Sequence, residues 1–209
     1  MEFDTSTRRG PKPKPNTRHD LVQAGLQTIH TEGFAATGIQ SIVERAGVPK
    51  GSFYNHFDSK EAFGGEVIDV YARLGQDRLQ AFLGNSGLPP LVRLEAYFDD
   101  RIQSLVAGGY TRGCLMGNFS AEAADHSTLI REHLVHHWDA CSKVFESCIA
   151  EAQLNGSVDD RVPAGLLARF MFNSWEGALL RMRVEKSEAA LTEFKEVVFG
   201  TLLTSRRRS

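Results

Sequence analysis

Apolar residues recur three and four positions apart through most of the 209-residue chain, which is the spacing of one face of an α-helix. Glycines and prolines separate these series and mark helix ends. No stretch alternates apolar and polar residues as a half-buried strand does. We therefore expect an all-α fold of about nine helices. Their expected positions are 17–32, a short run closed by Ala46–Gly47, 50–56, 60–83, Leu91 to Gly108, 118–124, 127–154, 163–185 and 187–204.

Two of the shortest expected helices form a unit near the N-terminus. A turn at Gly47 joins them, and Pro49 suits the first position of the second helix because its missing N–H would be unpaired there. Phe53 and Phe57, four apart, turn the apolar side of that helix inward. Its other residues are left exposed, namely Lys50, Gly51, Ser52, Tyr54, Asn55 and His56. This pattern predicts a helix-turn-helix, whose second helix enters the DNA major groove.

The exposed residues of that helix suit two kinds of DNA contact. At its flanks, and at the start of the next helix, three side chains can reach phosphates: Tyr54, His56 and Lys60. Three others can reach base edges in the roughly 12 Å wide major groove: Lys50, Ser52 and Asn55. Gly51 has no side chain and lets the helix come close to the duplex.

Charge is distributed unevenly, although the net charge is only −2. Residues 1–60 carry eight Lys/Arg against six Asp/Glu, whereas the remainder carries sixteen against twenty. The first part holds basic residues interleaved with prolines, which favour extended, unpaired chain. These basic residues are Arg8, Arg9, Lys12 and Lys14. We expect residues 1–16 to form a flexible arm that contacts phosphates or the minor groove; the alternative is a solvated tail.

Deleting residues 1–15 distinguishes these two roles of the arm. If its cations meet phosphates, the truncated chain should bind duplex DNA more weakly, because fewer counterions are released on binding. The slope of log affinity against log salt should then become shallower by about 0.9 for each phosphate that the arm neutralises in the full-length chain. An unchanged salt slope would show that the arm is only a solvated tail.

The helix-turn-helix region carries the motif of a known family. The runs FAAT at 34–37 and IQSIVERAGVPKGSFYNHFDSKEAF at 39–63 closely resemble the TetR family of repressors. The resemblance implies a DNA-binding domain over 17–62 and a domain over 63–209 that binds a small ligand and dimerises through its last two helices. It implies phosphate contacts from Thr37, Lys50, Tyr54, His56 and Lys60, and base contacts from Ser52 and Asn55. Gly38 departs from the family's commoner Thr or Ser, so it has no hydroxyl for the contact beside Thr37, although its backbone N–H can still donate.

A second, shorter match lies in the C-terminal part. The runs RGCLMGNFSAE at 112–122 and WEGALLR at 175–181 resemble the family branch that contains acrylate-responsive and N-ethylmaleimide-responsive regulators. Cys114 follows the cation Arg112 and precedes a helix expected to begin near Asn118. A neighbouring cation and a helix N-terminus both favour the thiolate. We interpret Cys114 either as a sensor thiol that adds electrophiles or is oxidised, or as a small packing residue.

Aromatic side chains of the C-terminal helices are expected to fill the core and to wall an apolar pocket. Candidate pocket residues are Phe119, Trp138 and Trp175, with Glu176 and Arg181 as polar ligands. For the two charged residues, the alternative is a surface or interface ion pair. His133 and His137 lie one helical turn apart, but no third metal ligand at a suitable spacing is evident. We therefore expect no metal and no other cofactor.

The expected partners follow from the helix-turn-helix. A protein that binds a two-fold symmetric DNA site needs its recognition helices about 34 to 36 Å apart. The chain should therefore form a homodimer on a palindromic double-stranded DNA operator. A small-molecule inducer, by the family resemblance an unsaturated acid or an electrophile, should release it. No apolar run reaches the roughly 18 residues of a membrane span, and three cysteines are too few for a disulfide framework. A cytoplasmic protein without a membrane partner is expected.

Two other classes of protein remain as alternatives. A cysteine-dependent enzyme would use Cys114 with a histidine, although no oriented base or oxyanion device is visible in the sequence. Turnover of an ester or acrylate would indicate that class, whereas a stoichiometric adduct indicates sensing. A nonspecific architectural DNA-binding protein would share the basic arm and the helix-turn-helix. Footprinting separates it, because only a specific repressor protects a discrete palindrome.

Overall fold

The computed structural model describes residues 16–205, and every regular element in that range is helical. The helices are α1 (Thr17–Glu32), α2 (Ile39–Ala46), α3 (Lys50–Tyr54), α4 (Lys60–Leu83), α5 (Pro90–Ala107), α6 (Leu115–Ala123), α7 (Thr128–Leu154), α8 (Ala164–Glu185) and α9 (Ala189–Val197), with a π-helical turn η1 (Val198–Leu202). Over these residues the expected all-α fold of nine helices is confirmed.

Three of the helix ends that differ from the sequence expectation have a clear local reason. α6 begins at Leu115, three residues early, because the Cys114 carbonyl already accepts the Asn118 N–H at 3.0 Å. α3 ends at Tyr54, since the Phe53 carbonyl accepts both the His56 and the Phe57 N–H groups. The last helix changes to a π-helical turn, which leaves a five-residue hydrogen bond from Leu203 N to Val198 O.

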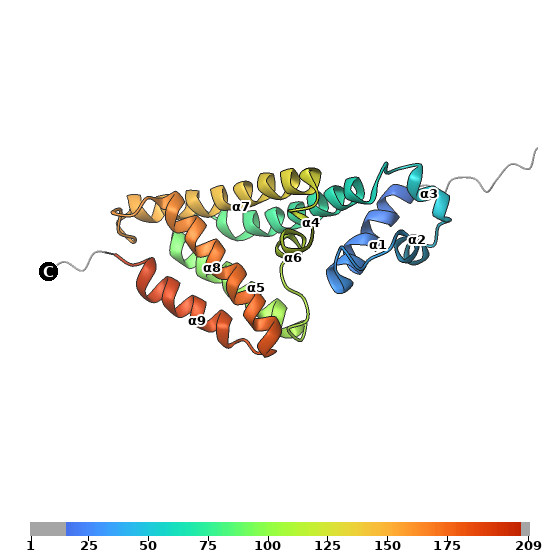
Figure 1. Cartoon of the computed structure of the whole chain (residues 1–209). Helices are drawn as coiled ribbons and strands as arrows, with labels where there is room; N and C mark the ends of the chain where they lie inside the picture. Colours follow the sequence, from blue (N-terminus) through green and yellow to red (C-terminus); the bar gives the residue numbers. More distant parts are fainter. Residues whose placement is uncertain (1–15, 206–209) are drawn as a thin grey trace, which may run out of the picture.

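The helices form an elongated molecule in which α4 and α7 run side by side (Figure 1). α1, α2 and α3 lie together at one end, and α5, α8 and α9 lie toward the other. α6 sits between these two groups and contacts α1, α4 and α7. Among the described residues, no helix is long and apolar enough to span a bilayer.

The buried side chains form two clusters, and one of them crosses from the N-terminal helices into the rest of the molecule. Its centre is an aromatic group in which the ring of Phe53 lies 5.3 Å from that of Phe57 and 5.2 Å from that of Phe63. The same cluster includes Phe119 of α6 and Ile130 of α7. The N-terminal helices therefore share a core with α6 and α7, and a displacement of α6 disturbs both.

The glycine pair at the start of α4 has a packing role, although glycine lowers helix propensity. A Cβ at Gly64 would lie 2.8 Å from the ring of Phe34, and a Cβ at Gly65 would lie 2.8 Å from Nε2 of His133. The two glycines thus let α4 approach both the loop after α1 and the side of α7.

Candidate functional site

The aromatic group beneath α3 determines which side chains of this helix are buried and which face solvent. Phe53 is fully buried, while the side chain of Tyr54 next to it remains 56% exposed. The other exposed residues of this segment are Lys50, Gly51, Asn55 and His56. Ser52 is half-buried. The structure thus leaves most of the α3 residues expected to meet base edges and phosphates open to solvent around the buried side chain of Phe53.

Lys60 lies at the start of α4 and joins this helix to the segment before α2. Its ammonium is 4.5 Å from the centre of the Phe34 ring and donates to the Ala35 carbonyl at 3.4 Å. Burial lowers its pKa, and the carboxylates of Glu61 and Glu122 act in the opposite direction. Lys60 is therefore partly engaged within the protein, beside the place where a phosphate contact is expected.

Thr37 is engaged within the protein. Its side chain is fully buried, and its hydroxyl donates to the Gly33 carbonyl at 2.6 Å. Its backbone N–H bonds to the same carbonyl at 3.2 Å. Both donors stabilise the turn after α1 in the DNA-free chain, so the expected phosphate contact of Thr37 stays a prediction that requires this hydroxyl to change its partner. Gly38, which follows, is exposed and caps α2 in an extended conformation.

The basic arm residues Arg8, Arg9, Lys12 and Lys14 lie outside the described residues. Their expected role stays a prediction.

Two hydrogen bonds tie the N-terminal helices to α6 and to the loop before it. The Ala35 N–H donates to Oε2 of Glu122 at 2.9 Å. Nε2 of His30 lies 2.8 Å from the carbonyl oxygen of Gly113, next to Cys114. No sequence pattern indicates either bond, since each joins residues more than eighty positions apart. The α6 region is therefore positioned to transmit a change to α1.

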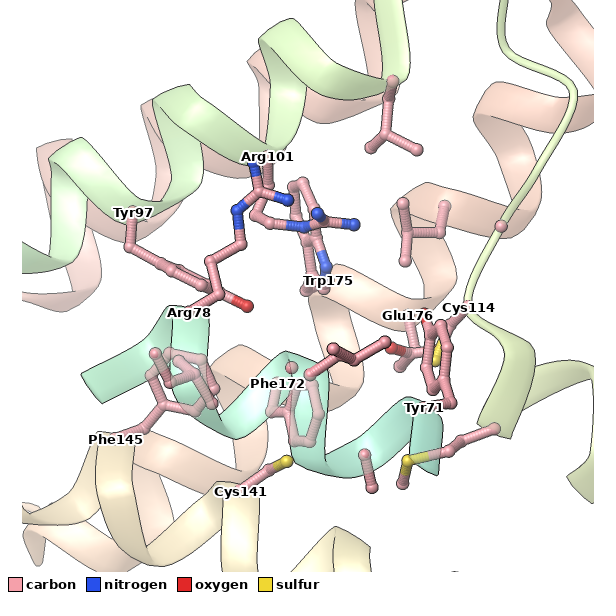
Figure 2. A pocket seen from close by; sticks show the side chains of 18 residues that line it. Tyr71, Arg78, Tyr97, Arg101, Cys114, Cys141, Phe145, Phe172, Trp175 and Glu176 are labelled. Atoms are coloured by element: carbon pink, nitrogen blue, oxygen red, sulfur yellow. The ribbon is translucent and has the colours of Figure 1, made fainter. Parts of the chain in front are cut away.

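A cavity of about 230 Å³ lies among α4, α5, α6, α7 and α8 (Figure 2). We call it the effector pocket, and its walls include Tyr71, Arg78, Tyr97, Arg101, Cys114, Phe145, Phe172, Trp175 and Glu176. A second hollow of about 430 Å³ adjoins it and shares Cys114 and Glu176. The first volume falls below the roughly 300 to 1,000 Å³ of drug-sized sites, which indicates a small ligand.

Cationic and acidic groups lie in different parts of the effector pocket. Figure 2 shows Arg78 and Arg101 on the side of α5, and Glu176 pointing toward Cys114. Arg78 is paired with Asp100, its Nε lying 2.6 Å from Oδ2. Within residues 16–205, Arg101 has neither an ion-pair nor a hydrogen-bond partner. Its guanidinium is therefore available to a polar or anionic ligand.

The carboxyl of Glu176 is held in an apolar environment. Burial raises its pKa to about 7, while the hydrogen bond with Cys114 and the charge of Arg101 partly oppose this effect. Glu176 thus changes charge near neutral pH. This titration lies directly beside the effector pocket.

The sequence predicts that the surroundings of Cys114 stabilise its thiolate, but in the structure they favour the protonated thiol. Burial, followed by the negative charge of Glu176, raises its pKa well above the ordinary range, and the N–H groups of Gly117 and Met116 offset only part of this. Arg112 is exposed to solvent and so contributes little beside the thiol. The structure therefore favours the packing interpretation, in which Cys114 is a half-buried wall residue whose raised pKa keeps the thiol protonated at neutral pH.

Alkylation of Cys114 should accordingly be slow. We expect iodoacetamide to modify it at pH 7.5 at least about tenfold more slowly than a cysteine in a flexible peptide, because the thiolate is the reactive form. Glu176→Gln should accelerate the reaction, since it removes the neighbouring negative charge. Mass spectrometry of the peptide containing Cys114 gives both rates. A rate at or above that of the free peptide would restore the reactive-sensor interpretation.

The other expected pocket residues divide into three that border a cavity and two that do not. Trp175 and Glu176 line the effector pocket, and Trp138 lines the adjoining hollow. Phe119 is fully buried and its ring packs 4.9 Å from that of Phe34, so it belongs to the core. Arg181 points to solvent and pairs with Glu185 across 2.6 Å. A pocket role for Arg181 is therefore wrong, because it lies on the opposite side of α8.

Several polar groups of the pocket were missed from the sequence: Tyr71, Arg78, Tyr97 and Arg101. They come from α4 and α5, which no motif marked, and only the packing of those helices against α8 brings them to the cavity. The sequence shows no third ligand for His133 and His137 at a suitable spacing, but in the structure Asp69 of α4 lies beside both histidines.

The exposed recognition helix, its aromatic support and the separate internal pocket define a helix-turn-helix DNA-binding regulator with an internal cavity. Residues 21–67 match the family described as "Bacterial regulatory proteins, tetR family". Residues 90–198 match "Tetracyclin repressor-like, C-terminal domain". The chain belongs to the TetR family of transcriptional regulators.

Named relatives support this assignment. The chain is 40% identical over 188 residues to the HTH-type transcriptional repressor DhaR of Mycobacterium sp. (strain GP1), covering 90% of this chain and 93% of the relative. It is 32% identical over 207 residues to the transcriptional regulator AcuR of Cereibacter sphaeroides, covering 95% and 92%. The crystal structure of reduced E. coli NemR superposes with a TM-score of 0.84 at 26% identity, covering 91% of this chain and 98% of that one. These relatives are transcriptional regulators by name, a class distinct from enzymes.

Proposed function

We propose that the protein is a ligand-responsive repressor that binds a palindromic operator as a homodimer and leaves it when a small molecule occupies the effector pocket. In this proposal residues 17–62 bind DNA, residues 63–209 bind the ligand and dimerise, and residues 1–16 form the basic arm. The observation that carries it is the exposed α3 surface, which shares a buried core with the pocket wall in α6.

Dimerisation through α8 and α9 is supported by an exposed apolar row on α8. Its members are Leu166, Phe170, Leu180 and Val184, each at least 52% exposed. Gly177 lies within the row and has nothing near its missing Cβ. A row of large apolar residues interrupted by glycine suits close packing against a second helix, and an exposed patch of this kind marks an interface.

The chemistry of the effector pocket favours a small ligand with an apolar body and one anionic group. Trp175, Phe145 and Phe172 supply apolar walls, and Arg101 supplies an unpaired cation. An unsaturated acid fits both features. A soft electrophile fits less well, because the environment of Cys114 favours its protonated thiol.

Release from DNA requires that the ligand favour a conformation with a different spacing of the two α3 helices. The pocket wall at Gly113 is bonded to His30 of α1, and Glu122 of α6 is bonded to Ala35 before α2. A ligand that displaces α6 therefore moves α1 and α2, and with them α3. α4, which joins Lys60 to the pocket wall, moves in the same step.

Footprinting on the promoter region nearest the protein's own gene tests the function. The proposal predicts one protected two-fold site, with protection removed when a short unsaturated carboxylic acid that fits the pocket is added. Arg101→Gln should keep the footprint and reduce the response to the acid. Uniform protection of unrelated duplexes would instead identify an architectural DNA-binding protein.

A further inference from the structure

Three potential metal ligands meet where α4 packs against α7. Oδ1 of Asp69 lies 2.8 Å from Nδ1 of His133 and 2.7 Å from Nε2 of His137. The three ligand atoms all fall within 4.8 Å of one another. They open onto a surface hollow of about 420 Å³ that shares no lining residue with the effector pocket. The cluster is therefore separate from the site proposed above.

The residue types and their spacing suit a divalent transition-metal ion. His133 and His137 are four apart on α7, which places both imidazoles on one face, and Asp69 supplies a carboxylate from the neighbouring helix. Two imidazoles and one carboxylate, with further positions left to water, form a common ligand set for Zn²⁺. Bonds of about 2.0 to 2.2 Å require ligand atoms roughly 3.3 Å apart. The carboxylate oxygen of Asp69, now 2.8 and 2.7 Å from the two imidazole nitrogens, therefore has to move slightly away from them to admit an ion.

The burial of His137 supplies an independent observation. Its side chain is only 10% exposed, and within residues 16–205 its Nδ1 is buried without any hydrogen-bond partner. The burial fixes the orientation of the ring, and in this orientation its other nitrogen, Nε2, points at Asp69. The orientation of the His133 ring is also restricted, because this ring packs against Gly65.

The charges around the cluster permit a cation. Asp69 supplies an acidic side chain that lies in hydrogen-bond contact with both His133 and His137. Arg73 of α4 and Glu132 of α7 line the same hollow and offset one another, and His136 and Gln76 complete its rim. A bound ion meets neutral imidazoles, and each histidine that was doubly protonated releases one proton.

We propose that Asp69, His133 and His137 form a binding site for one divalent transition-metal ion of the Zn²⁺ class, joining α4 to α7. The ion replaces the two hydrogen bonds of Asp69 with three metal–ligand bonds. Because α4 begins beside the helix-turn-helix, an ion at this position fixes the helix that leads to α3 against the body of the molecule.

Metal titration of the full-length, reduced chain after treatment with a chelator tests this site. Zn²⁺ is titrated calorimetrically and Co²⁺ by visible absorption, which reports coordination geometry. We expect one equivalent of each ion to bind, without thiolate-to-cobalt absorption, because the three cysteines lie elsewhere. His133→Gln and His137→Gln should each weaken binding by about 100-fold, since even the removal of an outer partner of a ligand costs 10- to 100-fold. Binding should also weaken as the pH is lowered, because protons compete with the metal ion for the imidazole nitrogens.

His136→Gln is the matched control, because His136 lines the same hollow without belonging to the cluster. It should bind Zn²⁺ as the parent chain does. Asp69→Asn retains a hydrogen-bond acceptor and serves as a milder variant whose folding is checked by circular dichroism. Weak, nonstoichiometric binding by the parent chain, or equal affinity in the His133 and His136 variants, would overturn the proposal. Neither outcome depends on DNA binding, so the proposed repressor function is tested separately.

Discussion

Leucine in place of Gly51 should abolish specific DNA binding while leaving the protein folded. Gly51 is exposed on α3, and a Cβ at this position would meet no atom of the protein within 4 Å. The folded chain therefore accommodates a side chain, and removing a helical glycine should stabilise it by about 0.5 to 1 kcal/mol. In the complex, the same side chain stands between the helix and the bases. We expect operator affinity to fall at least 100-fold, or about 2.8 kcal/mol.

Gly51→Ala is the matched control for this substitution. It brings nearly the same gain in helix propensity but adds only a methyl group, so its reduction in DNA affinity should be much smaller. Fluorescence anisotropy with a labelled operator gives the affinities, and urea denaturation gives the free energies of unfolding. If the leucine variant were stable and bound DNA as tightly as the parent chain, α3 could not be the helix that lies in the groove.

Glutamine at Glu176 should remove a large part of the pH dependence of stability. Burial raises the pKa of Glu176 from 4.5 to about 7, so the folded chain holds this proton more tightly than the unfolded chain does. The stabilising effect is complete below pH 4.5 and is lost as the pH rises to about 7. Relative to Glu176→Gln, the parent chain should therefore lose about 2 to 3 kcal/mol of unfolding free energy between pH 5 and pH 8.

Glu185→Gln provides the comparison on the same helix. Glu185 pairs with Arg181, whose side chain is 63% exposed, so neutralising Glu185 should change stability little at any pH. Denaturant unfolding at pH 5 and pH 8 measures all three proteins. An equal pH dependence in the parent chain and in Glu176→Gln would mean that Glu176 is ionised throughout this range and is not held in an apolar wall.

Local patterns were sufficient to predict the helix-turn-helix. The pair Phe53 and Phe57, the turn at Gly47 and the proline at position 49 act within a few residues of one another, and the structure keeps Tyr54 and Asn55 exposed as this pattern indicates. The same local reasoning could have excluded Arg181 from the pocket. At about 100° per residue, Arg181 lies roughly 240° around α8 from Trp175, which faces inward.

The contacts between distant helices, at the effector pocket and elsewhere, depended on information that no local pattern contains. Asp69 reaches His137 across 68 positions, and His30 reaches Gly113 across 83. Cys114 shows most clearly why sequence neighbours do not predict the surroundings of a side chain. Its neighbour in sequence is a cation, but its neighbour in space is the carboxyl of Glu176, and burial with that group determines its pKa. Only the packing of α8 against α6 and α7 places Glu176 beside Cys114.

Binding to operators with altered half-site spacing tests the central claim most directly, since the proposed repressor depends on two α3 helices held in one dimer. Once footprinting has defined the site, five base pairs are inserted between its halves, which turns the second half-site to the opposite face of the duplex. The account predicts two chains per intact operator by analytical ultracentrifugation and a fall in affinity to that of a single half-site after the insertion. A monomeric chain that binds both duplexes equally well would contradict it.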